Sequence, residues 1–394
     1  MPKLTIEQLD LAGKRVFLRA DLNAPLEGNV VLDDTRLRAV VPTLEHALGA
    51  GASVVLASHL GRPRGGPDPK YSLRPVAERL GALLGRPLPL APDCVGPETT
   101  AQAQALKAGE VLLLENLRFH PEEERNDDAF ARALAVLADC YVNDAFAAAH
   151  RAHASIAGIT RHLQPAAAGL LMQRELEALG RILEAPERPL VAVLGGAKVS
   201  DKVALVESLL GRVDALLIGG GMAFTFLRAL GHDVGRSLVE TDRIETARSA
   251  LEAARRRSVQ IGLPVDTVVA DDPDSPAGRP VAVREIPATQ MGLDIGPMTV
   301  ERFAAALKTA GTIVWNGPMG VFEKPPFAHG TLALARAVAA ARAFSVIGGG
   351  DTVAAVNMAG VADRIGYIST AGGAFLEFLE GRALPGVEAL TEAA

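Results

Sequence analysis

Several basic side chains in the first half of the chain come directly after apolar runs. They are Arg36, His59 with Arg62, Arg118 and Arg151. In a parallel α/β sheet such positions meet at the carboxyl ends of the strands, so side chains far apart in the sequence line one crevice. A single arginine is commonly part of a surface ion pair. Its repetition after successive strands favours a binding site for an anion that carries several oxygens.

A polar turn follows the first apolar run. Asp21 and Asn23 fall on the same side of the chain, because alternate residues of an extended segment share a face. They are placed to bind hydroxyl groups of a ligand, or else to form an Asx turn before a proline. The loop at 58–63, with a histidine, a glycine and an arginine in close succession, is more specific for an anion.

Glycine-rich segments follow apolar runs in the second half, at 195–198, 219–221 and 348–351. Glycine lets backbone N–H groups approach phosphates closely. We expect the first segment to begin a helix on which Lys198 and Lys202, four residues apart, share a face. A helix N-terminus with two ammonium groups suits the phosphates of a nucleotide.

Two carboxylates accompany these glycines. Glu323 ends the turn that begins at Asn316 and is placed to bind ribose hydroxyls. Asp351 stands beside a nest of the size of a phosphate, where a carboxylate would ligate Mg²⁺ bound to the nucleotide. The alternative is that Asp351 is the N-cap of the next helix, and the two roles are compatible.

Composition limits the class of protein. With 394 residues, 49% of them hydrophobic, the chain exceeds what one hydrophobic core usually serves, so we expect two domains. Its net charge of -6 argues against a nucleic-acid binder, because such proteins usually carry a basic balance. The longest uncharged apolar stretch, 215–227, is too short to span a bilayer, and the cytoplasm is the expected compartment.

The cysteines and histidines give no metal-ligand pattern. Cys94 and Cys140 lack CxxC spacing, and so few cysteines form no disulfide framework, so we expect two buried thiols. His150 and His153 are not at the His-x3-His spacing of a helical zinc site. The sequence therefore predicts no zinc centre.

Short apolar runs alternate with segments of helical period, which predicts βαβ units and parallel sheets. In the first half we expect a helix over 36–48 and the strands 16–18, 53–57, 111–114 and 140–142. In the second half we expect strands of the same kind at 190–194, 215–218, 265–270, 312–315 and 345–347. The fold class is α/β, with two Rossmann-like lobes, each a parallel sheet flanked by helices.

A connecting helix is expected between the lobes, because leucines and Met172 recur at helical spacing before Pro186. The expected division is an anion-binding domain at 1–170, the connecting helix at 171–186 and a nucleotide-binding domain at 187–370. A C-terminal segment at 371–394 either stands apart or returns to the first domain.

The chain resembles the phosphoglycerate kinase family over essentially its whole length. The resemblance rests on several independent motifs. They are RADLNAP, SHLGRP, ENLRFH, VNDAF with AHRAH, GGAKVSDK, GGGMAFTF, GLDIGP, WNGPMGVFE, GGGDT and STAGG.

The resemblance implies a glycolytic phosphotransferase that acts on 3-phosphoglycerate, 1,3-bisphosphoglycerate, ADP and ATP, with Mg²⁺ as Mg-ADP or Mg-ATP. The expectation of two complete lobes favours a working monomer. The residues implied to bind the phosphoglycerate are Asp21, Asn23, Arg36, His59, Leu60, Gly61, Arg62, Arg118 and Arg151. Those implied for the nucleotide are Lys198, Lys202, Gly292, Glu323, Gly349, Gly350, Asp351 and Thr352, with Asp351 as the metal ligand. Those implied for catalysis are Arg36, Lys198, Lys202, Gly350 and Gly373.

The chain departs from the family pattern at three places: Ala24, the pair Ala147 and Ala148, and Ala371. Only Ala371 bears on chemistry, because the family has a full glycine triplet there. If that position required a positive φ, alanine would cost about 1 kcal/mol or shift the loop.

Two other functions compete with a kinase. A non-catalytic two-lobed sensor of sugar phosphates would share the arginine crevice but has little use for Lys202, Glu323 and Asp351 together. A nicotinamide-dependent dehydrogenase would need a Gly-x-Gly-x-x-Gly fingerprint, which the glycine triplets do not supply. The Walker spacing of Gly-x4-Gly-Lys-Ser/Thr is absent as well.

Overall fold

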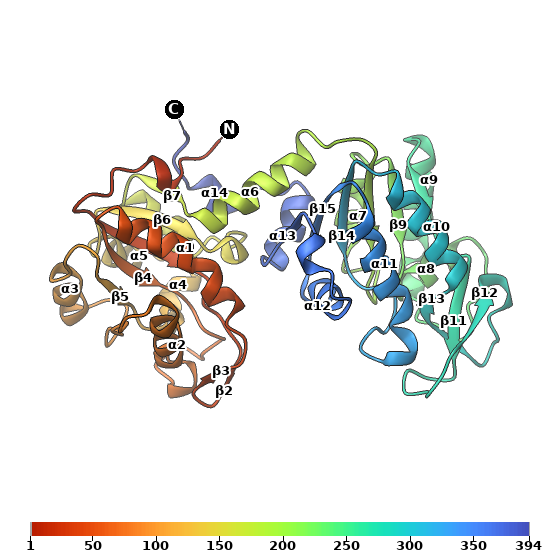
Figure 1. Cartoon of the computed structure of the whole chain (residues 1–394), viewed down its shortest axis with the longest axis horizontal. Helices are drawn as coiled ribbons and strands as arrows, with labels where there is room; N and C mark the ends of the chain where they lie inside the picture. Colours follow the sequence, from red (N-terminus) through yellow and green to blue (C-terminus); the bar gives the residue numbers. More distant parts are fainter. Residues whose placement is uncertain (1, 394) are drawn as a thin grey trace. The chain divides into compact units, whose positions relative to one another are not determined.

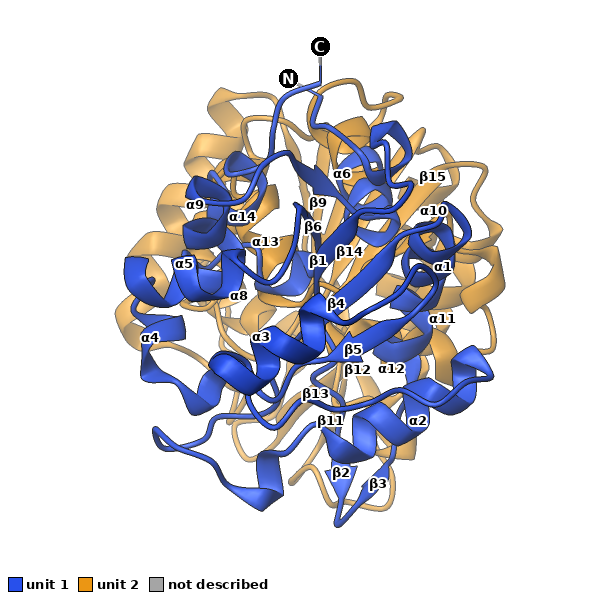
Figure 2. Cartoon of the chain, turned by 90° about the vertical axis from the view of Figure 1, so that its left-hand side faces the viewer, with its two compact units in different colours: residues 1–177, 383–394 blue, residues 178–382 orange. Residues whose placement is uncertain are grey.

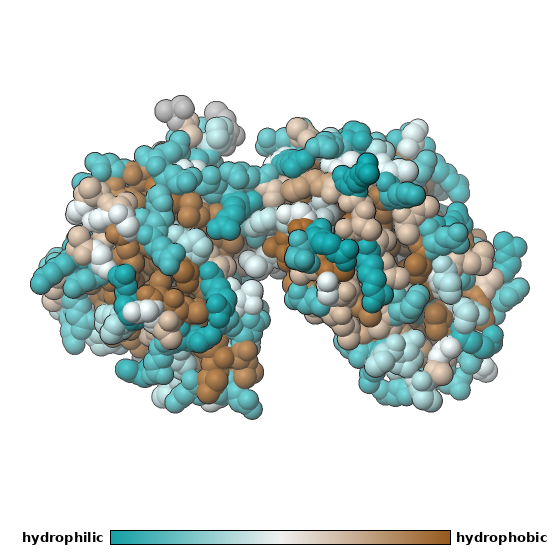
Figure 3. All heavy atoms as spheres, viewed as in Figure 1, coloured by the Kyte–Doolittle hydropathy of each residue, from teal (hydrophilic) through white to brown (hydrophobic). Residues whose placement is uncertain are grey.

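The computed structural model describes residues 2–393, which divide into two compact units. Unit 1 contains the described residues up to Glu177 together with those from Ala383 onward, and unit 2 runs from Ala178 to Arg382 (Figure 2). Figure 3 shows hydrophilic side chains over much of the visible surface of each unit. No helix among the described residues has the length and apolar character that a membrane span requires.

Unit 1 is built on a five-stranded parallel sheet of order β5-β4-β1-β6-β7 (Figure 1). Its strands are β1 (Arg15–Ala20), β4 (Ser53–Ala57), β5 (Val111–Leu113), β6 (Cys140–Asp144) and β7 (Ala166–Ala168). The flanking helices are α1 (Thr35–Gly49), α2 (Arg74–Leu84), α3 (Pro97–Gln104), α4 (Pro121–Glu124), α5 (Asp128–Ala135) and α14 (Pro385–Glu388). A hairpin of β2 (Leu26–Glu27) and β3 (Val30–Val31) follows β1.

The register of this sheet aligns the carboxyl ends of its central strands. Arg19 on β1 pairs with Ala57 on β4 and with Asn143 on β6. The segments that follow these strands therefore leave the sheet at the same edge. Because the strands are buried on both faces, their sequences are largely apolar, and all four expected strands of this half are confirmed within a few residues.

Helix α1 confirms the expected helix over 36–48. Its buried face carries Leu37, Val40, Leu44 and Ala47, which repeat at helical spacing and pack into the core of unit 1. The first turn of α1 holds Arg36. The packing of the helix thus fixes the position of the Arg36 backbone.

Unit 2 holds a six-stranded parallel sheet of order β10-β9-β8-β14-β15-β16. Its strands are β8 (Leu190–Leu194), β9 (Ala215–Ile218), β10 (Gln260–Gly262), β14 (Thr312–Asn316), β15 (Phe344–Gly348) and β16 (Tyr367–Ile368). Its helices are α7 (Val203–Leu209), α8 (Met222–Ala229), α9 (Ile244–Arg256), α10 (Pro297–Lys308), α11 (His329–Ala340), α12 (Gly350–Met358) and α13 (Gly373–Leu379). Asn316 pairs with both Leu194 and Gly348, so the glycine-rich segments also follow the sheet at one edge.

One expected strand belongs to a different sheet. The strand expected at 265–270 is β11 (Asp266–Ala270), which pairs antiparallel with β12 (Arg279–Ala282) and β13 (Met291–Ile295). The parallel arrangement expected for it is wrong. The connection to β12 is too short for the crossover that parallel pairing needs, and it allows only a hairpin.

The helix expected to begin at 195–198 is also wrong. The chain stays irregular there, and α7 begins only at Val203, so Lys198 and Lys202 do not share a helical face. The side chain of Glu240 accepts hydrogen bonds from the N–H groups of Val199 and Ser200, the latter at 3.0 Å. These external partners hold the segment as a loop.

Helix α6 (Leu170–Leu183) lies where the connecting helix was expected, but the boundary between the units falls inside it, between Glu177 and Ala178, rather than near Pro186. The C-terminal segment divides. Residues 371–382, with α13, belong to unit 2, and the described residues from Ala383 onward belong to unit 1. There the Leu4 N–H donates to the Thr391 carbonyl at 2.8 Å.

Trp315 is the centre of the unit 2 core. Its side chain is fully buried on β14, and its indole N–H donates to the Gly317 carbonyl at 2.8 Å. We expect Trp315→Ala to lower the free energy of unfolding by about 3–5 kcal/mol, because a large cavity would remain. Urea unfolding followed by circular dichroism measures it. The exposed Met358 is the control: Met358→Ala should change stability by less than about 0.5 kcal/mol, and equal losses in both variants would contradict this account of the core.

Candidate active site

A cluster of basic side chains surrounds His59 in unit 1. His59 is buried, and burial together with the charges of Arg19, Arg118, Arg151 and Arg36 holds its pKa well below the usual value. The structure thus brings together four of the residues selected from the sequence. An imidazole among these guanidinium groups is neutral and offers an N–H to an anion.

Arg19 sets which ring nitrogen of His59 carries that proton. A guanidinium only donates hydrogen bonds, and Nη2 of Arg19 lies 3.2 Å from Nδ1 of His59. Nδ1 therefore accepts, and the proton lies on Nε2.

Arg19 is held by a buried acidic partner that the sequence analysis missed. Its Nε donates to Oγ of Ser155 at 2.8 Å, and that hydroxyl donates to Glu123 at 2.6 Å. Arg19, Ser155 and Glu123 are all buried. Burial raises the pKa of Glu123, and the Arg19 charge opposes the rise. An arginine inside an otherwise apolar strand was the signal that could have revealed this network.

The loop after β4 is braced by hydrogen bonds to other loops. The Gly61 N–H donates to Oδ1 of Asn23 at 2.8 Å, and its carbonyl accepts from Arg118 at 2.7 Å. The N–H of Leu60 donates to Asn116 at 3.2 Å, and the Leu60 side chain lies in the core. Leu60 and Gly61 therefore support the loop through their backbone. Gly61 has a φ of +59°, and a Cβ there would meet the Tyr71 ring.

The remaining basic residues are more exposed. Arg36 pairs with Asp21 at 2.5 Å, so this sequence-selected carboxylate orients an arginine. Arg151 donates from Nε to His150 at 3.1 Å. Arg62 is exposed at the end of the loop.

Unit 2 contains a cavity of about 480 Å³ among the glycine-rich segments. Three residues selected from the sequence, Gly292, Glu323 and Asp351, line it. Sequence analysis missed its apolar wall, although Phe224 stands in the GGGMAFTF motif and Met319 and Val321 stand in WNGPMGVFE. That wall includes Phe224, Leu238, Met291, Met319 and Val321. A cavity with one apolar wall and carboxylates at other points suits a base joined to a polar sugar.

Lys202 lies beside the glycine-rich segments, tied to the end of β14. Its Nζ donates to the Asn316 carbonyl at 3.0 Å and also to the Asn316 side chain. Burial lowers the pKa of Lys202 to about 8, against the raising effects of Asp201 and Asp351. Lys198, in contrast, is exposed and close enough to lower the pKa of Glu240.

The start of α12 is fixed by β14. Gly349 is the N-cap, with a φ of +96°, and a Cβ there would press on the Asn316 amide. The Thr352 hydroxyl accepts from the Gly317 N–H at 2.7 Å and is buried. Thr352 therefore supports the helix start, while Gly350 and the exposed Asp351 form its first turn.

The glycine segment at 371–373 carries no strain at its alanine. Among the described residues that are not glycine, a positive φ occurs only at Asn126 and Ser258. Ala371 therefore has no positive φ, and the conformational cost of about 1 kcal/mol considered for it does not arise. Ala371 is buried, and its N–H donates to the Ser369 hydroxyl at 3.2 Å. The positive φ of +55° falls on Gly372, which leads into the first turn of α13 at Gly373.

Comparisons with known proteins agree on one family. The sequence profile described as "Phosphoglycerate kinase" matches residues 6–382. The chain belongs to the phosphoglycerate kinase family. It is 58% identical over 394 residues to the phosphoglycerate kinase of Moorella thermoacetica and 56% identical over 403 residues to that of Acidobacterium capsulatum, with 100% of each chain covered.

Solved structures of the family are similar too. The phosphoglycerate kinase of Coxiella burnetii has a TM-score of 0.92 and 43% identity, and that of Pyrococcus horikoshii has a TM-score of 0.82 and 35% identity. Each comparison covers 98% of both chains. The chain is therefore an enzyme, a phosphotransferase with a carboxyl acceptor. The alternative of a non-catalytic sensor gains no support.

The environment of His59 gives a test by NMR. We expect its imidazole to remain neutral, protonated on Nε2, through the region near pH 6.5 in which an unperturbed histidine titrates. Arg19→Met should raise the pKa of His59, because one nearby positive charge is removed. Nitrogen-15 shifts of the ring measure both effects.

The same shift bears on stability. His59 binds a proton more weakly in the folded than in the unfolded protein. Its contribution to the free energy of unfolding is therefore present above about pH 6.5 and is lost as the pH falls below that value. Titration of His59 near pH 6.5 in the folded protein, unchanged in Arg19→Met, would refute the described arrangement.

Proposed function

We propose that this enzyme transfers a phosphoryl group reversibly from 1,3-bisphosphoglycerate to Mg-ADP, giving 3-phosphoglycerate and ATP in glycolysis. Family membership supports the reaction. The observation that carries it is the presence of two complementary anion sites on separate units. One is the arginine cluster around His59, and the other is the glycine-lined cavity beside Lys202.

In unit 1 the phosphoglycerate would bind to the arginine cluster. Arginine presents N–H groups in a fork that matches phosphate and carboxylate oxygens. Four guanidinium groups already repel one another around His59, so a bound anion relieves that repulsion. Asp21 and Asn23 would face the hydroxyl group, while Leu60 and Gly61 keep the loop in place.

In unit 2 the nucleotide would place its base against the apolar wall and its phosphates near the start of α12. The first N–H groups of a helix and its dipole attract phosphate. Glu323 would bind the ribose, and Lys202 and Lys198 the phosphates. Thr352 and Gly349 maintain the geometry of this turn.

Asp351 fits a role as the Mg²⁺ ligand. It is an exposed carboxylate on the cavity that holds the nucleotide, and Mg²⁺ prefers oxygen ligands that it shares with phosphates and water. When bound, the ion neutralises negative charge on the nucleotide phosphates.

The transfer needs no general base. The attacking oxygen belongs to a carboxylate with an ordinary pKa of about 4, so it is already ionised at neutral pH. The enzyme has to align the groups and neutralise charge on the oxygens of the transferred phosphoryl. We assign this to Arg36, Lys202 and Lys198, with backbone N–H groups at Gly350 and Gly373.

Because the two sets of residues belong to different units, the reaction requires them to come together. Helix α6 and the turn at 369–370 are the proposed hinges. Closure would also exclude water that hydrolyses the acyl phosphate. We further propose that the enzyme works as a monomer in the cytoplasm.

The direct test is Mg²⁺-dependent formation of ADP from ATP and 3-phosphoglycerate, with the acyl phosphate trapped by hydroxylamine. The hydroxamate should form with 3-phosphoglycerate and not with 2-phosphoglycerate. No hydroxamate despite binding of both ligands would refute the proposed reaction.

Arg36→Ala should lower kcat by at least about 10²-fold, because a cation that stabilises the transition state is lost. ADP affinity should change little, since Arg36 belongs to unit 1. Steady-state kinetics and calorimetry measure the two effects. Arg38→Ala is the matched control on the same helix, because Arg38 is exposed and paired with Asp34. A near-normal kcat for Arg36→Ala would remove this residue from the mechanism.

Lys202 should make nucleotide binding depend on pH. With a pKa of about 8, its ammonium group is mostly charged at pH 7 and mostly neutral at pH 9, so ADP affinity should fall about tenfold across this range. Calorimetry at both pH values measures it. Lys202→Arg should make ADP affinity nearly independent of pH over this range. Lys198→Ala should weaken ADP binding but leave its pH dependence unchanged. The same slope in Lys202→Arg would assign the titration to another group.

A further inference from the structure

Three side chains of different chemistry meet in unit 1 outside the proposed ligand sites. They are Asp93, Cys94 and His120, and one ligand atom of each lies within 4.8 Å of the other two. No other group of three or more histidine, cysteine or acidic side chains with this spacing occurs among residues 2–393. The sequence did not predict it, because His120 is far along the chain from the other two.

The three side chains are held in place by their surroundings. Oδ1 of Asp93 lies 2.8 Å from Nε2 of His120 and also accepts from the Cys94 N–H at 2.6 Å. The His120 ring stacks on Phe130 with centroids 5.2 Å apart. The Cys94 side chain is buried, whereas the side chains of His120 and Asp93 are 27% and 44% exposed. The partly exposed side chains of Asp93 and His120 thus leave a path from solvent to the buried sulfur of Cys94.

We propose that Asp93, Cys94 and His120 form a binding site for a divalent transition-metal ion of the zinc type. A thiolate, an imidazole and a carboxylate are the ligands that Zn²⁺ and Co²⁺ prefer, while Mg²⁺ prefers oxygen alone. Three protein ligands leave a fourth tetrahedral position for water. This site is separate from the Mg²⁺ role of Asp351, which lies in unit 2.

Metal binding replaces a proton. Burial and the neighbouring Asp93 and Glu123 carboxylates raise the pKa of the Cys94 thiol well above its usual value. The sulfur therefore enters as a thiol, gives its proton to the buffer and donates an electron pair to the ion. No electron is transferred, and no further reactant is needed.

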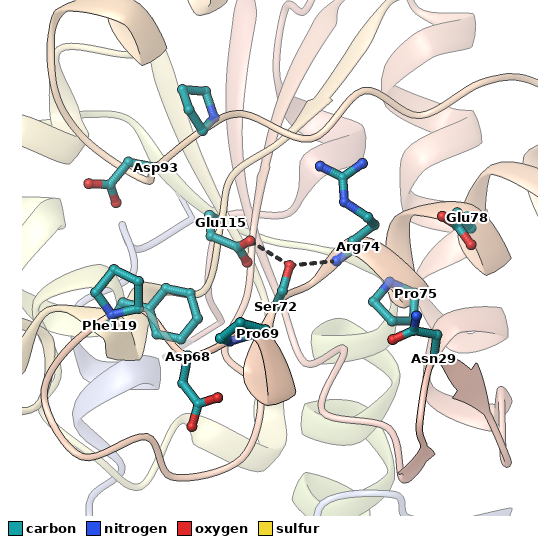
Figure 4. Close-up of a pocket in the computed structure, with 12 residues that line it drawn as sticks. Asn29, Asp68, Pro69, Ser72, Arg74, Pro75, Glu78, Asp93, Glu115 and Phe119 are labelled. Atoms are coloured by element: carbon teal, nitrogen blue, oxygen red, sulfur yellow. Dashed lines mark hydrogen bonds between the residues drawn. The ribbon is translucent and has the colours of Figure 1, made fainter.

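The proposed metal site lies next to the turn that carries Arg118. Asp93 and Phe119 lie on one side of a cavity of about 470 Å³, and Glu78 lies on the other (Figure 4). His120 directly follows the turn 117–119, which carries Arg118 of the arginine cluster. A bound ion would link that turn to the segment at 93–94.

A carboxylate and histidine pair without a cysteine lacks the thiolate ligand of the proposed site. Asp128 and His162 make the same contact, also at 2.8 Å, without a cysteine. This second pair is therefore a natural control. Cys140 is the corresponding control for the thiol, because it is buried and does not belong to the cluster.

The test uses Co²⁺ added to the full-length protein after treatment with a chelator and a reductant. Thiolate coordination produces a sulfur-to-cobalt charge-transfer band, which a histidine and carboxylate pair cannot produce. We expect this band to saturate at equimolar Co²⁺ and to disappear on addition of Zn²⁺. Cys94→Ser and His120→Gln should lose it, while Cys140→Ser and His162→Gln should keep it.

Binding can also be followed without the thiolate band. Zn²⁺ should raise the melting temperature of the wild type and of His162→Gln, but not of His120→Gln. Circular dichroism establishes that each variant is folded. Absence of the band in the wild type, or its retention in Cys94→Ser, would overturn the proposal whatever the enzyme's activity.

Discussion

The cost of placing positive charge partly out of water is the constraint on which both ligand sites depend. In unit 1 the guanidinium groups of Arg19, Arg36, Arg118 and Arg151 keep His59 neutral. In unit 2 burial lowers the pKa of Lys202. A cation that has lost part of its hydration is stabilised by an anion bound next to it. A bound phosphate thus adds to the negative charge that the protein already places near these cations, such as Asp21 beside Arg36.

The fold controls which of these charges are fixed and which are free to respond. Arg19 is locked by Ser155 and the buried Glu123, so its charge is balanced inside unit 1. Arg62 and Lys198 are exposed. A fixed inner group orients the ligand at little entropic cost, whereas exposed groups order themselves when the ligand binds. This division suits an enzyme that has to bind a highly charged substrate and release it.

Much of the parallel framework could be predicted, because strands buried on both faces have largely apolar sequences. The strand 53–57 was located to the residue. Sequence periodicity does not say which partner a strand selects, so β11 was placed in the wrong sheet. The loop at 195–202 depends on Glu240, which is distant in sequence, and no local pattern could show that contact. The network behind His59 also joins residues distant in sequence, but there Arg19 inside an otherwise apolar strand was a local signal.

Hydrogen–deuterium exchange with each ligand alone tests most directly the claim that two separate units bind the two substrates. The account predicts that 3-phosphoglycerate protects amides of unit 1 near Gly61 and Arg118, and that ADP protects amides of unit 2 at 349–352 and near Gly292. Protection of both segments of unit 2 by 3-phosphoglycerate alone, with unit 1 unaffected, would contradict it.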